Sequence, residues 1–261
     1  MKIGLIGCGN LGSSLLRGLL KTGAEKADEV IVADMDKKKL ELLRKLGIKT
    51  TKDNKKAAEA DIIFIAVRPG LVGEILDEMR EVSKGKLIVS VAAGVSTKFI
   101  EDRTDARVIR VMPNICALAA EMASCFCPGT KASKEDEELV KGLLSGLGMT
   151  FKVEEEMMDA VTGLSGSGPA YFYSMIKALK EVGIELGLSE DVALKLAAQT
   201  AKGAGEMVIR SGRSLDELTD MVCSPKGATV EGLKVLKSQK VPESFKEAVK
   251  AAAKRSKELS R

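Results

Sequence analysis

Short apolar runs alternate with amphipathic, helix-like segments over the first part of the chain. The strand-like runs, apolar at almost every position and rich in β-branched residues, are 2–7, 30–33, 62–67, 87–92 and 107–112. Helical patterns lie between them, for example over residues 10–21 and 36–46. Strands that are apolar on both faces and alternate with helices predict a doubly wound parallel sheet with helices on both sides.

The pattern changes in the second part of the chain, where no convincing strand follows Gly168. Ser189 and Ser214 stand just before helical patterns, where N-cap residues are expected. The helices expected here cover residues 169–186, 190–209, 215–222, 228–237 and 242–259. We therefore expect an α/β domain over residues 1–160 and an all-α domain over residues 161–261.

The composition is that of a globular protein, with 45% hydrophobic and 30% charged residues. The longest apolar stretch, residues 87–95, contains Ser90 and is too short to span a bilayer. Leu5-Ile6-Gly7-Cys8 resembles a lipoprotein cleavage site, but only residues 1–4 precede it, which leaves no room for a hydrophobic signal region. We expect a cytoplasmic protein without a membrane partner.

The chain contains no histidine, which excludes Ser-His-Asp and Cys-His catalysis and histidine-ligated zinc. Its 5 cysteines include no Cys-x-x-Cys pair, so we expect reduced thiols and no metal site. The net charge of +4 and the 3% of aromatic residues give little support to nucleic-acid binding. A cofactor that carries the reactive group is compatible with these absences.

One glycine-rich motif follows the first strand-like run and opens the first helix. It reads Gly7-Cys8-Gly9-Asn10-Leu11-Gly12, and it fits the G-x-G-x-x-G pattern in the required context. Gly7 permits a tight turn, Gly9 lets the backbone approach a pyrophosphate, and Gly12 allows close packing of helix and strand. The helix N-terminus then offers N–H groups to the phosphates. The motif predicts a Rossmann-type dinucleotide-binding domain; the alternative is a glycine-rich turn without a ligand.

Asp34 ends the second run, about 20 residues beyond Gly12, where an acidic residue accepts hydrogen bonds from the adenosine ribose. Such a carboxylate favours NADH and repels the 2′-phosphate of NADPH, although the lysines at 37–39 lie close enough to offset that repulsion. The alternative role is N-cap of the next helix, for which Asp34 and Asp36 serve equally well. We expect NADH or NADPH as cofactor, with a slight preference for NADH.

Small residues and turns also follow two further strand-like runs. They are Ala66-Val67-Arg68-Pro69 and Ala92-Ala93-Gly94. Doubly wound sheets bind their ligands at these carboxyl ends of strands, so both segments are candidates for cofactor contacts. A plain strand exit is the alternative for each.

Two turns lead into helices of the second part. They read Leu164-Ser165-Gly166-Ser167-Gly168-Pro169-Ala170-Tyr171 and Ser224-Pro225-Lys226-Gly227-Ala228-Thr229. In the second turn, the N–H groups of Gly227, Ala228 and Thr229 are suited to an anion such as a carboxylate. A helix–helix turn with Ser224 as the cap explains the same residues equally well.

These segments resemble the pyrroline-5-carboxylate reductase family. The resemblance rests on residues 159–171 and 224–233, which contain the two turns, and on Arg110-Val111-Met112-Pro113-Asn114. Gly7 to Gly12, Asn54 and Ala66 to Pro69 also fall in the register of the family. The resemblance covers essentially the whole chain.

The resemblance implies reduction of 1-pyrroline-5-carboxylate to L-proline by NADPH or NADH, the last step of proline synthesis. It also implies that helical domains interlock into a homodimer, from which larger assemblies are built. By the same mapping, the substrate lies between the nicotinamide and the turn formed by Ser224, Gly227, Ala228 and Thr229. Glu155 lies near the substrate ring in this mapping, and Asn54 contacts the adenosine half of the cofactor.

The reaction that the resemblance implies agrees with the missing histidine. An imine that arrives protonated is already electrophilic, so the enzyme needs mainly to orient it and bind its carboxylate. We therefore expect Thr229, which hydrogen-bonds the substrate in the family, to orient it; with water it could also handle the proton of the ring nitrogen.

The chain departs from the family at a few positions. Asn114-Ile115-Cys116 replaces the usual Asn-Thr-Pro, Lys226 stands where Gly is most common, and Met221 where a polar residue is. These departures leave open a reductase of another cyclic imino acid, such as the six-membered homologue. A nicotinamide-binding regulatory protein without turnover is the alternative of another class. Hydroxyacid dehydrogenases with a catalytic lysine are disfavoured by the two turns.

Overall fold

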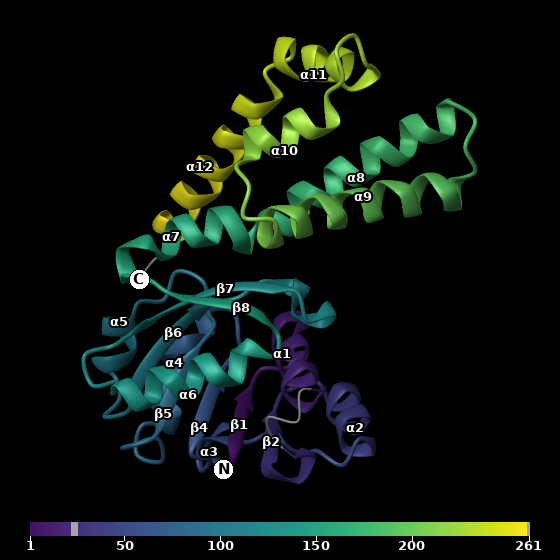
Figure 1. The fold of residues 1–261 in the computed structure, drawn as a ribbon. Helices are drawn as coiled ribbons and strands as arrows, with labels where there is room; N and C mark the ends of the chain where they lie inside the picture. The colour runs from purple at the N-terminus through teal and green to yellow at the C-terminus, as the bar shows by residue number, and fades with distance from the viewer. Residues whose placement is uncertain (22–25, 260–261) are drawn as a thin grey trace. The chain divides into compact units, whose positions relative to one another are not determined.

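The computed structural model describes residues 1–21 and 26–259 (Figure 1). Its contacts group residues 1–167 and the residues from Lys250 onward into one unit, and Gly168–Val249 into a second. We call them the sheet unit and the helical unit. The expected division after residue 160 stays a prediction; by contacts, residues 161–167 and the end of the last helix group with the sheet.

An eight-stranded sheet forms the centre of the sheet unit, in the order β3-β2-β1-β4-β5-β6-β7-β8. The strands are β1 Ile3–Ile6, β2 Val30–Ala33, β3 Lys49–Thr51, β4 Ile62–Ile65, β5 Leu87–Ser90, β6 Arg107–Met112, β7 Met122–Pro128 and β8 Gly148–Lys152. Strands β1 to β6 run parallel, with Leu5 of β1 paired to Val32 on one side and Phe64 on the other. Strand β7 is antiparallel to β6, and β8 is parallel to β7.

The central strands are buried on both faces, as their apolar runs predict. Every residue of β1, β4 and β5 is buried. One face packs against α1 and α6 through a core that includes Leu5, Leu16 and Leu144. The other packs against α3, α4 and α5 through a core that includes Ile63 and Leu76. The doubly wound α/β fold is therefore confirmed.

Short polar caps start most helices of the sheet unit. Asp36, Asp53, Ser96 and Ser133 each accept a backbone N–H in the first turn of α2, α3, α5 and α6. The helices are α1 Asn10–Lys21, α2 Lys37–Lys45, α3 Asn54–Ala58, α4 Val72–Met79, α5 Thr97–Glu101, α6 Lys134–Ser145 and α7 Met158–Val161. The 3-10 turns are η1 Ala27–Glu29, η2 Pro69–Leu71, η3 Ile115–Ala119 and η4 Glu155–Met157, and η5 Thr162–Gly166 is a π-helix.

The helical unit contains α8 Gly168–Glu185, α9 Glu190–Arg210, α10 Leu215–Val222, α11 Ala228–Ser238 and the first part of α12 Val241–Leu259. Ser189 and Ser214 cap α9 and α10, as predicted. All the regular structure described over residues 168–259 is helical. Within the described part of the chain, no helix is both long and apolar enough to cross a membrane.

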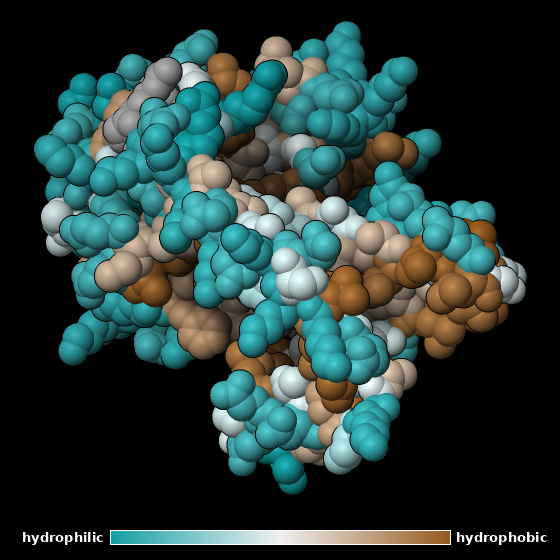
Figure 2. All heavy atoms as spheres, turned by 90° about the horizontal axis from the view of Figure 1, so that it is seen from above, coloured by the Kyte–Doolittle hydropathy of each residue, from teal (hydrophilic) through white to brown (hydrophobic). Residues whose placement is uncertain are grey.

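Apolar side chains cover much of the surface of the helical unit. Its buried apolar side chains, within the described residues, are those of Ala193 and Ala197. Larger side chains on α8 and α9 are exposed, including those of Phe172, Leu179 and Leu196. Figure 2 shows such apolar surface, in brown, at the end of the α8–α9 pair on the right. Exposed apolar area of this extent indicates a protein–protein interface.

Candidate active site

The glycine-rich motif forms the loop between β1 and α1. Gly7 has a φ of +93°, which favours glycine, and its N–H donates to the carbonyl of Ala33 at 2.8 Å. A Cβ at Gly7 would come within 2.7 Å of the carbonyl oxygen of Ala66. A Cβ at Gly12 would collide with the carbonyl oxygen of Gly7. Both positions therefore admit only glycine in the present packing of α1 on the sheet.

Gly9 differs from these two glycines, because a Cβ there would meet no atom within 4 Å. The space in front of its exposed backbone is open. The loop continues through Asn10, the first residue of α1, whose carbonyl accepts from Ser14, and through the half-buried Leu11. The open backbone at the N-terminus of a helix fits a dinucleotide pyrophosphate, the group that the motif predicts.

Asp34 lies at the end of β2 and is bonded to the glycine loop. Its Oδ2 accepts from the N–H of Cys8 at 2.7 Å, and its Oδ1 accepts from the N–H of Asp36 at 2.8 Å. Asp36 is the N-cap of α2, bonded to the N–H groups of Lys38 and Lys39. The alternative of Asp34 as the helix cap is therefore wrong.

Burial raises the pKa of the Cys8 thiol, and the Asp34 carboxylate raises it further. The neighbouring cations Lys39 and Arg17 act in the opposite direction on the same thiol. A cavity of about 220 Å³ lies beside the loop, between α1 and α2, and both cations line it together with Cys8 and Gly9. Of the lysines at 37–39, Lys39 is thus the one that lines the space beside the loop.

The two other strand ends lie at the same edge of the sheet, since β1, β2, β4 and β5 run parallel. Ala66 follows β4, donates its N–H to Ile6 at 2.8 Å and is followed by the half-buried Val67. The exposed Arg68 and then Pro69 lead into η2. Ala92, which is buried, and Ala93, which is half-buried, follow β5 and lead into a turn at Gly94, whose φ is +71°.

Asn54 lies at the start of α3, and its side chain already has a partner. Its Nδ2 donates to Oε2 of Glu78 on α4 at 2.8 Å. This bond uses one of the two N–H donors of Nδ2, so the second N–H and the carbonyl oxygen of the amide remain for a contact with the adenosine half of a cofactor.

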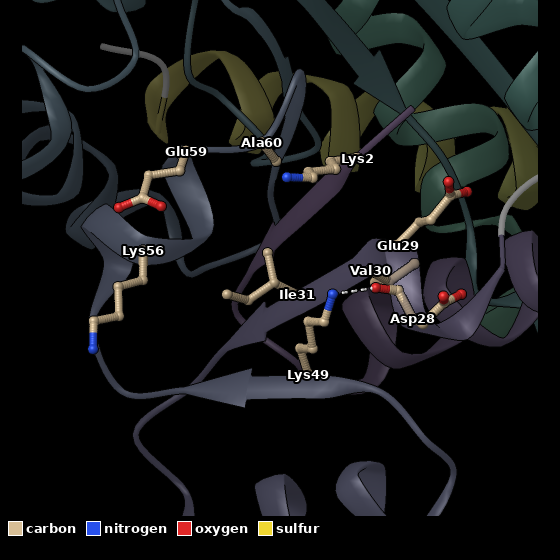
Figure 3. A pocket seen from close by; sticks show the side chains of 9 residues that line it. All are labelled: Lys2, Asp28, Glu29, Val30, Ile31, Lys49, Lys56, Glu59 and Ala60. Atoms are coloured by element: carbon tan, nitrogen blue, oxygen red, sulfur yellow. Dashed lines mark hydrogen bonds between the residues drawn. The ribbon is translucent and has the colours of Figure 1, made fainter.

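A second cavity, of about 210 Å³, lies at the opposite edge of the sheet. Charged side chains of both signs surround it, including Lys2, Lys56, Glu29 and Glu59 (Figure 3). Lys49 donates from Nζ to the carbonyl of Asp28 at 2.6 Å across one side. This edge holds the amino ends of the parallel strands, where doubly wound folds do not bind their cofactor.

Glu155, a candidate substrate residue, belongs to the sheet unit and has both carboxylate oxygens engaged. Oε1 accepts from the N–H of Thr97 at 2.7 Å and from Nη1 of Arg110 at 3.1 Å. Oε2 accepts from Oγ1 of Thr97 at 2.5 Å. The Arg110 side chain is only 6% exposed and that of Glu155 30%.

The roles of Thr97 and Arg110 were not anticipated from the sequence. One signal existed, because Arg110 is the charged residue within the otherwise apolar stretch 108–112, and a buried charge needs a partner.

The remaining candidates form the turn before α11 in the helical unit. Gly227, not Ser224, is the N-cap of α11, and it donates its N–H to the Ser224 carbonyl at 2.9 Å. The alternative of Ser224 as the cap is therefore wrong. No side chain caps α11, and its first two residues, Ala228 and Thr229, are exposed. This N-terminus is suited to an anion.

Lys226 shows why the family has glycine at this position. Its φ is +60°, and it follows Pro225 in a turn closed by the Ser224–Gly227 bond. Pro at the second position and a positive φ at the third are typical of a type II turn, in which glycine is the usual third residue. Lysine is tolerated here at a conformational cost of about 1 kcal/mol.

The cysteines are free, and burial raises the pKa of Cys127, the residue opposite Arg110 in the sheet, to about 12. Over the described residues, no group of His, Cys, Asp and Glu is placed to hold a metal ion. The structure thus offers an open glycine loop with adjoining strand ends on the sheet unit and a helix N-terminus without a side-chain cap on the helical unit.

Comparison with known proteins matches both units. Residues 2–94 match a family of NADP oxidoreductases described as coenzyme F420-dependent, and residues 155–259 match the pyrroline-5-carboxylate reductase dimerisation family. A pyrroline-5-carboxylate reductase of Methanosarcina acetivorans is 40% identical, over 100% of this chain and 98% of its own. Human pyrroline-5-carboxylate reductase 2 is 38% identical over 99% of this chain and 84% of its own.

Solved structures agree over the full length. The Plasmodium falciparum pyrroline carboxylate reductase with NADP bound superposes with a TM-score of 0.92 at 29% identity, covering 100% of this chain and 98% of that one. The Coxiella burnetii pyrroline-5-carboxylate reductase gives 0.91 at 32% identity, with the same coverage. With the glycine loop, the turn before α11 and the identity over the whole length in agreement, this chain belongs to the pyrroline-5-carboxylate reductase family.

Proposed function

We propose that this protein reduces 1-pyrroline-5-carboxylate to L-proline, the last step of proline synthesis, with hydride from NADH or NADPH. The observation that carries the proposal is the N-terminus of α11, which has no side-chain cap and follows the turn that the family shares. Its free N–H groups suit the carboxylate of a cyclic imino acid. The open backbone at Gly9 supports the cofactor half of the site.

The chain's own residues bind and orient the reactants. A bound nicotinamide cofactor supplies the hydride, so the protein needs no nucleophile and no histidine. The N–H groups at Ala228 and Thr229 hold the carboxylate, next to the turn that the Gly227 N–H closes by donating to the carbonyl of Ser224. The Thr229 hydroxyl orients the ring, and the proton that the ring nitrogen needs is already present on the iminium form of the substrate.

The test of this function is oxidation of NADH and NADPH, followed by absorbance, with and without racemic 1-pyrroline-5-carboxylate. We expect rapid substrate-dependent oxidation by the native protein. Thr229→Ala is expected to lower kcat/KM for the pyrroline about tenfold or more, the loss typical of one hydrogen bond to a bound substrate. The dissociation constant for NADH is expected to change less than twofold.

Thr229→Ser is the matched control, because it keeps the hydroxyl and is expected to retain most of the activity. Equal loss of turnover and of cofactor binding in Thr229→Ala would contradict the orienting role and indicate a folding defect. If the protein reduces the six-membered homologue but not 1-pyrroline-5-carboxylate in the same assay, the homologue is the substrate. If the protein binds NADH or NADPH but oxidises neither with the pyrroline or its homologue, the result would favour a regulatory protein.

For the cofactor, we propose that Asp34 sets a modest preference for NADH. Its carboxylate lies against the glycine loop, where it accepts from Cys8 and is placed to accept from an adenosine ribose. Lys39 and Arg17 line the cavity beside the loop and are the cations available to a 2′-phosphate, so NADPH is also accepted.

Asp34→Ser is expected to shift the ratio of kcat/KM for NADPH over NADH about tenfold toward NADPH, because it removes a negative charge near the 2′-phosphate. The ratio is measured with both cofactors at a fixed substrate concentration. Asp36→Ser is the control, since it removes the same charge two residues further on and keeps an oxygen that caps α2. An unchanged ratio in Asp34→Ser would mean that Asp34 only holds the loop through Cys8.

We also propose a homodimer, formed through the exposed apolar residues of α8 and α9, in the region that matches the family's dimerisation model. The cytoplasm is the proposed compartment, since the cysteines are free thiols.

A further inference from the structure

We infer that Glu155 is a positioning residue that fixes the turn between β5 and α5, and through it the nicotinamide half of the cofactor. The inference rests on the proposed function. It assigns Glu155 a role different from the substrate contact that the resemblance implies, and the residues that carry it all belong to the sheet unit.

The sheet order places the two halves of a dinucleotide on opposite sides of β1. The glycine loop follows β1, and Asp34, which marks the adenosine side, follows β2. A dinucleotide that crosses the carboxyl edge at this point extends its other half past β4 toward β5. The turn after β5, with Ala92 and Ala93, is therefore the part of the edge that meets the nicotinamide end.

The far end of this turn is bonded to a residue distant in the sequence, Glu155. The turn bends at Gly94, with a φ of +71°, and it enters α5, a helix of only 5 residues. Ser96 caps that helix by accepting from Phe99, which leaves the N–H of Thr97 for another partner. Glu155 is that partner: it accepts both the N–H and the hydroxyl of Thr97, at 2.7 and 2.5 Å.

Glu155 is itself held in place by Arg110 of β6, the neighbour of β5 in the sheet. The guanidinium is almost completely buried, and its Nη1 lies 3.1 Å from the carboxylate. These bonds join Glu155 to the buried guanidinium on one side and to Thr97 on the other, so its proposed effect on the reaction passes through Thr97 and the turn.

The test compares two ligands of the same protein variant. NADH contains the nicotinamide half, and ADP does not. In Glu155→Gln we expect the dissociation constant of NADH to rise roughly tenfold, while that of ADP changes less than twofold, both measured by calorimetric titration of the full chain. Thr97→Val removes only the hydroxyl bond and leaves the Arg110–Glu155 pair in place. We therefore expect the dissociation constant of NADH to rise by less than in Glu155→Gln, and that of ADP to stay unchanged.

Glu156→Gln is the matched control, because it removes one charge from the exposed residue next to Glu155 in the 3-10 turn η4. Both ligands are expected to bind it as they bind the native protein. Equal weakening of NADH and ADP in the Glu155 and Thr97 variants would overturn the inference and leave a general structural role. Unchanged binding of both ligands would overturn it as well.

The proposed function fails in a different way. A native protein that binds NADH but does not oxidise it with the pyrroline would refute the reaction, while the contrast between NADH and ADP in the variants would still decide the role of Glu155.

Discussion

Leu196→Glu is expected to convert the protein from a dimer into a monomer. The Leu196 side chain is 54% exposed, and it shares one face of α9 with Val192, four residues earlier. Ala193 and Ala197 face the interior instead, and Asp191 and Lys195 form an ion pair on the polar face. The helical unit thus exposes apolar side chains that a second copy covers in the proposed homodimer.

A carboxylate buried in such an interface costs about 3 kcal/mol, which weakens association roughly a hundredfold. Sedimentation or light scattering at micromolar concentration measures the change in mass. Lys202→Glu is the control: it also adds a negative charge to α9, at an exposed position, and is expected to leave the dimer intact. An unchanged mass in Leu196→Glu would place the interface elsewhere.

Gly9→Ala and Gly12→Ala are expected to separate two roles of the glycine loop. A Cβ at Gly9 enters open space, so we expect unchanged thermal stability and a dissociation constant for NADH raised at least tenfold, because the methyl group occupies the approach of the pyrophosphate. A Cβ at Gly12 collides with the Gly7 carbonyl oxygen, so we expect both the stability and the affinity to fall.

Thermal melting and fluorescence titration with NADH measure the two effects. Gly142→Ala is the control, since a Cβ there meets nothing within 4 Å and the residue lies inside α6, away from the loop. It is expected to raise stability by about 0.5 kcal/mol or more through helix propensity and to leave NADH binding unchanged. Normal NADH binding by Gly9→Ala would contradict the assignment of Gly9 to the pyrophosphate.

The sequence predicted the parts of the fold that rest on strong local patterns. The strands β1, β2, β4, β5 and β6 lie within the predicted runs, because each is apolar on both faces. The other three strands were missed. Strand β3 has only 3 residues, none of them buried, and β8 at the edge of the sheet is largely exposed, so neither has the run of a central strand.

Local chemistry also decided which parts of the candidate site could be foreseen. The glycine loop and the turn before α11 are contiguous in sequence, and the structure places each at a helix N-terminus. The choice between Asp34 and Asp36 as helix cap was not decidable from residue type, since both are good caps; the structure assigns it to Asp36. The contact of Glu155 with Thr97 and Arg110 joins residues 58 and 45 positions apart, a separation that no local pattern encodes.

The buried and half-buried thiols have a consequence for the chemical resistance of the protein. Thiolates, not thiols, react with peroxide and alkylating reagents. Burial raises the pKa values of Cys8, Cys116, Cys125 and Cys127, so little thiolate is present at these positions at neutral pH. Although Cys8 lies in the glycine loop proposed to bind the cofactor, we expect that loop to survive handling in air without added reductant.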